Sequence, residues 1–270
     1  MNYIKITSPS NPKIREALAI KIKRNKYKHN AFIIEGPHLI EMALASGNEI
    51  KKVFFTHTFS AKKEGQKLLR QLIKNTNELF EVTEQALNTL SDTETSQGII
   101  AISSYKPLNL NEIKFKSIPL LVVADGIQEP GNLGTIIRTS DAAGADAVII
   151  LQGTCDVFMQ KTLRATAGSI FNIPVIHTET NALLEWLPSN GISLIATAVD
   201  ARTSIFDADL GKAIAFVFGN EAHGVSSQMK KNADFILKIP IPGKAESLNV
   251  SASAAVCLYE AVRQRLSVSV

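Results

Sequence analysis

The sequence predicts an α/β protein in two parts, with a parallel sheet in the second part. Short apolar runs, such as PLLVVAD at 119–125 and AIAFVFGN at 213–220, alternate with segments of helical periodicity, as in repeated βα units. Strands that are apolar on both faces are typical of parallel sheets that helices cover on both sides. Ligands of such sheets bind beyond the carboxyl ends of the strands, so the loops after these runs are the candidate site.

Composition limits the class of protein and its compartment. With 45% hydrophobic and 20% charged residues, the 270-residue chain is typical of a globular protein. The longest apolar runs are too short to cross a membrane and residues 1–15 lack the apolar segment of a signal peptide, so we expect a cytoplasmic protein. The two cysteines, Cys155 and Cys257, are far apart in sequence, and we expect buried, reduced thiols and no metal site.

Basic residues are concentrated in the first half of the chain. Residues 1–117 carry 18 Lys and Arg against 11 Asp and Glu, whereas residues 118–270 carry 11 against 14. Segment 13–28 contains seven basic residues and one Glu, a charge density that suits the phosphate backbone of a nucleic acid. A solvated helix face would explain the same charges. The candidate contacts to RNA in this segment are Lys21, Lys23, Arg24 and Lys26.

Local patterns define two domains. Residues 1–103 alternate between helical and strand character, with a helix at 38–47 that ends in Gly47, and predict a small α/β domain. Residues 104–118 are polar and aperiodic, so we expect a linker before a larger domain at 119–270. We expect further strands at 51–56, 146–151, 172–177, 193–200 and 235–241, and further helices at 156–168, 179–188 and 224–232.

The first candidate loop, at 125–146, combines a glycine-rich turn with polar side chains. Asn132 can cap the helix that follows, and Arg138 falls in its second turn. An ion pair with Asp141, three residues further on, is the ordinary role for this arginine. The glycine spacing is GxxG and not GxGxxG, which makes a nicotinamide oxidoreductase improbable.

The second loop, at 216–226, follows a wholly apolar strand. Gly219 and Gly224 frame a short polar stretch, an arrangement that favours close approach of a ligand to the backbone. Glu221 in this stretch is either a site carboxylate or a helix-start residue favoured by the helix dipole. His223 is a candidate general base, although a single histidine in such a loop is more often a surface residue.

The third loop leads into the last helix with the sequence PIPGKAESLNVSASAA at 240–255. Ser247 stands where a helix N-cap belongs, and Asn249 then lies inside the first turn. The small residues that follow allow a close contact with another element of any kind.

Together the three segments at 129–146, 216–226 and 239–261 resemble the three motifs of the SpoU/TrmH branch of the SPOUT RNA methyltransferases. Glu129 stands where we expect Asp from the family pattern, a change that keeps the charge. The basic N-terminal part is similar in position and size to the family's substrate-binding domain. The resemblance implies a deep trefoil knot, a homodimer and S-adenosylmethionine as cofactor, with methyl transfer to a ribose 2′-hydroxyl.

The resemblance also implies a set of site residues. Those expected to contact the cofactor are Thr197, Gly219, Ile239 and Leu248. Those expected in the active site are Asn132, Arg138, Glu221, Ser247 and Asn249. In the family the arginine is proposed to act as a base or to anchor a phosphate, and guanidinium chemistry favours anchoring. We expect ribosomal RNA as substrate, with transfer RNA, or a non-catalytic RNA-binding role, as the alternatives.

Overall fold

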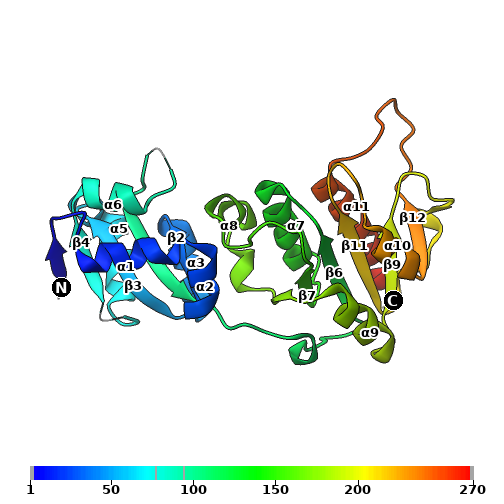
Figure 1. Cartoon of the computed structure of the whole chain (residues 1–270), viewed down its shortest axis with the longest axis horizontal. Helices are drawn as coiled ribbons and strands as arrows, with labels where there is room; N and C mark the ends of the chain where they lie inside the picture. Colours follow the sequence, from blue (N-terminus) through cyan, green and yellow to red (C-terminus); the bar gives the residue numbers. More distant parts are fainter. Residues whose placement is uncertain (1–2, 77, 94, 268–270) are drawn as a thin grey trace. The chain divides into compact units, whose positions relative to one another are not determined.

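The computed structural model describes residues 3–76, 78–93 and 95–267 (Figure 1). The chain separates into two compact units, one that ends at Pro107 and one that begins at Leu108. This division falls inside the predicted linker at 104–118. The domain boundaries predicted at residues 103 and 119 stay a prediction.

The first unit is built on a five-stranded mixed sheet in the order β1-β4-β3-β5-β2. Strands β1, β4 and β3 are parallel, and β5 runs antiparallel to both β3 and β2. Its elements are β1 (Ile4–Ile6), α1 (Pro12–Ile20), α2 (Lys23–His29), β2 (Ala31–Glu35), α3 (Pro37–Ala45), β3 (Ile50–Thr56), α4 (His57–Ser60), α5 (Lys63–Leu72), β4 (Leu79–Val82), α6 (Glu84–Leu90) and β5 (Ile99–Ser104).

The basic segment 13–28 forms two helices of this unit. Asn11 caps α1 by accepting a hydrogen bond from the backbone N–H of Lys13, and the buried face of α1 contains Ile14 and Ala17. Helix α2 ends where Asn30 adopts a left-handed conformation with φ of 46°, and strand β2 follows at once. No glycine or proline marks this boundary, which is why the sequence pattern did not predict β2.

The second unit contains a seven-stranded sheet in the order β10-β12-β9-β11-β6-β7-β8, in which all neighbouring strands are parallel. The predicted parallel α/β sheet is therefore confirmed, whereas the knot stays a prediction. The elements are η1 (Leu110–Glu112), β6 (Leu120–Asp125), α7 (Pro130–Ala142), β7 (Ala147–Ile150), α8 (Gln160–Thr166), η2 (Ser169–Phe171), β8 (Val175–His177), α9 (Thr180–Ser189), β9 (Ser193–Thr197), β10 (Thr203–Ser204), η3 (Ile205–Asp207), β11 (Ile214–Gly219), α10 (Ser227–Asn232), β12 (Phe235–Lys238) and α11 (Val250–Ser267).

Both faces of this sheet are buried, which explains the continuous apolar runs. In β6, Leu121 and Val123 join a core cluster with Leu183 of α9 and Met229 of α10. The alternate residue Val122 is also fully buried, although it lies outside that cluster. Burial of successive side chains on opposite faces requires apolar residues at every position of the strand.

Helices α7 and α8 are in backbone contact. A Cβ atom added at Gly134 of α7 would lie 2.4 Å from the carbonyl oxygen of Thr162 and 2.5 Å from the Cβ atom of Ala165, both in α8. Only glycine allows this approach, which fixes the position of α7 after the glycine-rich turn.

Within the described ranges, no helix is both long enough and apolar enough to cross a membrane.

Candidate functional site

The loops after β9, β11 and β12 surround a cavity of about 470 Å³ at the carboxyl edge of the parallel sheet. All four residues predicted to contact the cofactor line this cavity, and so do three of the predicted active-site residues. These seven residues are Thr197, Gly219, Glu221, Ile239, Ser247, Leu248 and Asn249. The volume is within the range of small-molecule sites, about 300–1,000 Å³.

The walls of the cavity combine apolar side chains with a few charged groups. Val199 and Leu248, which are 63% and 39% exposed, lie together in the lining, where a bound ligand would cover them. Ile239 and Ile241 add further apolar surface, and Lys230 is among the charged residues of the lining. Apolar walls with a few charged groups suit a nucleoside that carries an amino-acid group, as S-adenosylmethionine does.

The loop after β11 folds back on its own strand at Gly219. A Cβ atom at this position would lie 2.1 Å from the backbone of Gly224 and of Val225. Asn220 holds the turn, because its Oδ1 accepts from the N–H of His223 (3.1 Å) and its Nδ2 donates to the oxygen of Gly126 (2.9 Å). Gly219 is thus required by the loop's own backbone, and the tight turn exposes the next residue, Glu221, at the cavity.

The carboxylate of Glu221 joins the loop after β11 to the loop after β6. It accepts hydrogen bonds from the backbone N–H groups of Gln128 (3.0 Å) and Glu129 (3.1 Å) and from Nδ2 of Asn132 (2.9 Å). The Oδ1 atom of Asn132 in turn accepts from Nδ2 of Asn249 (3.0 Å). Three predicted active-site residues, which are far apart in sequence, therefore form one hydrogen-bonded chain.

These hydrogen bonds favour the charged form of Glu221. Partial burial acts to raise the pKa of this carboxyl group. The hydrogen bonds from Asn132, Gln128 and Glu129 outweigh burial and hold the pKa below its ordinary value of 4.5. Glu221 is therefore an anion at neutral pH that orients Asn132, and it does not begin a helix, because α10 starts only at Ser227.

Helix α7 is capped by Glu129 and not by Asn132, which corrects the expectation from the sequence. The carboxylate of Glu129 accepts from the backbone N–H of Asn132 (2.6 Å) and forms an ion pair with Nζ of Lys161 in α8 (2.6 Å). The hydrogen bond from Lys161 is the main reason that the pKa of Glu129 is lowered. Since Glu129 provides the cap, the side chain of Asn132 is available for Glu221 and Asn249.

A second correction concerns the start of α11. Asn249, and not Ser247, has its side chain placed as the cap: Oδ1 of Asn249 accepts from the N–H groups of Ser251 (2.9 Å) and Ala252 (3.4 Å). The other end of the same amide donates to Asn132. Ser247 instead lies before the helix, exposed and in the lining of the cavity.

Arg138 lies exposed on α7, outside the lining of the cavity. Its expected ion pair with Asp141 is not found among the described residues, and Oδ2 of Asp141 instead accepts from Nδ2 of Asn172 (3.1 Å). Arg138 therefore does not serve as the ion-pair partner of Asp141. His223 is exposed at the cavity, and its backbone N–H serves the turn at Asn220.

The two thiols take no part in this network. Cys257 is buried and Cys155 is half-buried, and both are free. Burial raises the pKa of Cys155 to about 11 and that of Cys257 to about 12, so both stay protonated at neutral pH. Across the described part of the chain, no group of histidine, cysteine and acidic side chains is placed to hold a metal ion.

The structure adds site residues that we did not predict from the sequence. The most informative are Gln128 and Glu129, whose backbone N–H groups hold Glu221, and Asp125, whose Oδ2 accepts from the N–H of Ser226 (2.7 Å). Glu129 directly precedes a proline at the first position of α7, which is a sequence signal for an N-cap. No local signal marks Gln128, because it contributes through its backbone.

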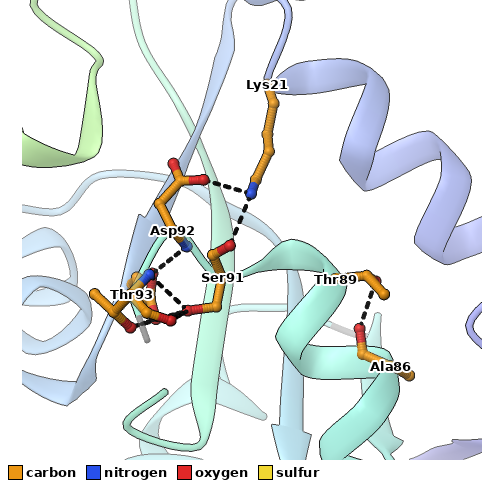
Figure 2. Close-up of polar contacts among 7 residues, drawn as sticks. Lys21, Ala86, Thr89, Ser91, Asp92 and Thr93 are labelled. Carbon is orange, nitrogen blue, oxygen red and sulfur yellow. Dashed lines mark hydrogen bonds and ion pairs between the residues drawn. The ribbon is translucent and has the colours of Figure 1, made fainter. Parts of the chain in front are cut away.

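The candidate RNA contacts in the first unit have different surroundings. Nζ of Lys21 donates to the carbonyl oxygen of Ser91 (3.1 Å) and pairs with Asp92 (2.6 Å), as Figure 2 shows. Lys26 is only 7% exposed, whereas Arg24 is exposed. The side chain of Lys23 lies outside the described residues. The role of these four residues stays a prediction, and Arg24 is the described one best placed to meet a large ligand.

The segment 91–93, which contacts Lys21, is joined to strand β2 by hydrogen bonds. The hydroxyl groups of Ser91 and Thr93 donate to the buried carboxylate of Glu35, and the backbone N–H of Asp92 donates to its second oxygen (3.2 Å). The contacts of Lys21 with Ser91 and Asp92 thus connect the end of α1 to the segment that follows α6 (Figure 2).

Comparisons with known proteins identify the family. Residues 119–259 match the model of the SpoU rRNA Methylase family, and residues 11–101 match that of the MRM3-like substrate binding domain. Because the first match covers more than half of the chain, the chain belongs to the SpoU rRNA methylase family, as the three motifs predict.

Individual relatives match over nearly the whole chain. A 23S rRNA guanosine 2′-O-methyltransferase, RlmP from Bacillus subtilis, is 33% identical over 254 residues, 94% of this chain and 97% of the relative. The AdoMet-bound rRNA methyltransferase from Sinorhizobium meliloti superposes with a TM-score of 0.85 at 29% identity, over 96% of this chain and 97% of that one. The SpoU methyltransferase AviRb from Streptomyces viridochromogenes, solved with AdoMet, gives 0.88 at 28% identity, with 95% and 99% covered.

The Glu221 network predicts an acid-dependent loss of stability. Glu221→Gln should lower the free energy of unfolding at neutral pH by about 1 kcal/mol, a modest value because the carboxylate is partly exposed. Since the folded-state pKa is lowered, this contribution is fully present above pH 4.5 and is lost as the pH falls through the folded-state value. Denaturant titrations from neutral to acid pH should therefore show the two proteins converging.

The matched control is Glu246→Gln, which makes the same change at an exposed glutamate before α11. It should leave the free energy of unfolding nearly unchanged at every pH. A difference between wild type and Glu221→Gln that does not vary with pH would contradict the role given to the carboxylate.

Proposed function

We propose that the protein transfers a methyl group from S-adenosylmethionine to a ribose 2′-hydroxyl of ribosomal RNA. The observation that supports this most strongly is the hydrogen-bonded chain of Glu221, Asn132 and Asn249 beside a nucleoside-sized cavity. The family of the chain and the full-length matches to rRNA 2′-O-methyltransferases support the same reaction.

The proposed reaction depends mainly on how the ribose hydroxyl is positioned relative to the methyl group of the cofactor. The bound cofactor supplies an electrophilic methyl group, and the ribose hydroxyl must reach it in line while losing its proton. Asn132 and Asn249, each held by a second hydrogen bond, are suited to orient the ribose. Arg138, exposed nearby on the same helix as Asn132, is suited to hold an adjacent phosphate through its guanidinium group.

The remaining proposals concern partners and place. We propose that the protein is a homodimer that uses α11, because this helix combines small residues with the exposed apolar side chains of Tyr259 and Leu266. The proposed substrate also makes the cytoplasm the expected location. Transfer RNA remains the alternative substrate, and an RNA-binding protein without activity is the alternative function. The hydrogen bonds that join Glu221, Asn132 and Asn249 argue against an RNA-binding protein without activity.

The reaction is tested with radiolabelled S-adenosylmethionine and ribosomal RNA without this modification. We expect labelled 2′-O-methylnucleosides with the wild type and a loss of at least about 100-fold with Arg138→Ala, a typical effect of removing a positioned charged group at an active site. Arg138→Lys should recover part of the rate if the arginine anchors a phosphate. Calorimetry with S-adenosylhomocysteine should give the same affinity for all three proteins.

Two results would overturn the proposal. If the wild-type protein labels neither ribosomal nor transfer RNA, the proposal that it is an RNA methyltransferase is wrong. Equal activity of wild type and Arg138→Ala would exclude the role of Arg138.

The first unit is tested by charge reversal at one exposed position. Arg24→Glu should weaken RNA binding and reduce its dependence on salt, because fewer counterions are released when one phosphate contact is lost. Cofactor affinity should not change. The measurement is a fluorescence titration with RNA at several salt concentrations.

Arg70→Glu is the matched control, since Arg70 is exposed on α5 of the same unit and its reversal changes the net charge equally. It should affect RNA binding much less. Equal effects of the two reversals would show that general charge, and not the α2 surface, attracts the RNA.

A further inference from the structure

Lys230 is a cation in the lining of the cavity that has no assigned role. It lies on α10 and is half-buried. In the described part of the second unit, Lys230 forms no ion pair. Three more exposed cations do form one: Lys161 with Glu129, Lys212 with Asp209, and Arg263 with Glu260. Other cations of this unit, such as Arg138 and Lys231, also form none, so Lys230 is distinguished by its place in the lining of the cavity.

The acidic groups of the cavity do not supply an ion-pair partner for Lys230. Glu221 is occupied by Gln128, Glu129 and Asn132. Asp200 also lines the cavity but is exposed, and no ion pair joins it to Lys230 among the residues described. The cavity therefore offers a positive charge whose hydrogen-bonding capacity is left for a ligand.

Stabilisation of the helix end does not explain where Lys230 points. Lys230 and Lys231 both lie in the last turn of α10, where a cation interacts favourably with the helix dipole. Only Lys230 lines the cavity, whereas Lys231 is exposed. Lys231 can thus interact with the helix dipole without lining the cavity, so this interaction does not require the position that Lys230 has.

We propose that Lys230 binds the α-carboxylate of S-adenosylmethionine, an inference that rests on the proposed function. The cofactor has one anionic group, the carboxylate of its methionine part, and two positive ones, the amine and the sulfonium. Charge complementarity therefore directs an ammonium group to the carboxylate and disfavours it beside the sulfonium. A lysine, as a compact charge on a flexible stem, suits one carboxylate in a partly open site.

Calorimetry with two ligands tests this assignment. S-Adenosylmethionine and decarboxylated S-adenosylmethionine differ only in the carboxylate. Lys230→Met should weaken binding of the first about tenfold, as expected when a hydrogen bond to a charged group is lost from a partly exposed site. It should not weaken binding of the decarboxylated ligand, which has only positive groups and so gains nothing from the lysine. Lys230→Arg, which keeps the charge, should retain most of the preference for the intact cofactor.

Lys231→Met is the matched control and should bind both ligands as the wild type does. Two results would overturn the assignment: unchanged affinity of Lys230→Met for the intact cofactor, or an equal loss for both ligands, which would mean that Lys230 only shapes the cavity. A wild-type protein that binds neither ligand would instead overturn the proposed function itself. Thermal unfolding of each variant checks that the fold is retained.

Discussion

The candidate site depends on one carboxylate that accepts three hydrogen bonds. Glu221 follows a strand of the parallel sheet and is held by two backbone N–H groups from the loop after the neighbouring strand β6 and by the amide of Asn132 in the first turn of α7. Asn132 then holds Asn249 at the start of α11. Hydrogen bonds within the protein thereby keep three segments that are far apart in sequence in one arrangement, which is what a positioning reaction needs.

The caps of two helices release the side chains that form this arrangement. Glu129 caps α7, so Asn132 can use its amide elsewhere, and Asn249 caps α11 through its oxygen while its nitrogen reaches Asn132. Gly219 lets the loop after β11 fold over its own strand, which exposes Glu221 at the cavity. Ordinary devices of local structure therefore determine where the polar groups of the site lie.

Much of the fold could be predicted from the sequence, because buried strands of a parallel sheet are apolar throughout and their helices are periodic. Candidate residues of the site could also be named, because three motifs resemble one family, and seven of the nine line the cavity. Their contacts could not. Side-chain type does not show that Glu129 rather than Asn132 caps α7, nor that backbone N–H groups hold Glu221. Likewise, the charge of segment 13–28 does not show that Lys21 is paired with Asp92 and that Lys26 is buried, since those depend on tertiary neighbours.

The central claim is that the three loops act as one unit through Asn132. A double-mutant cycle with Asn132→Ala and Asn249→Ala, measured as kcat/KM for methyl transfer to RNA, tests it most directly. If the two amides act as one unit, the double variant loses little more activity than the more damaging single variant, with a coupling of about 1 kcal/mol or more. If the two losses multiply, the residues act independently, and the account of a single preorganised network is wrong.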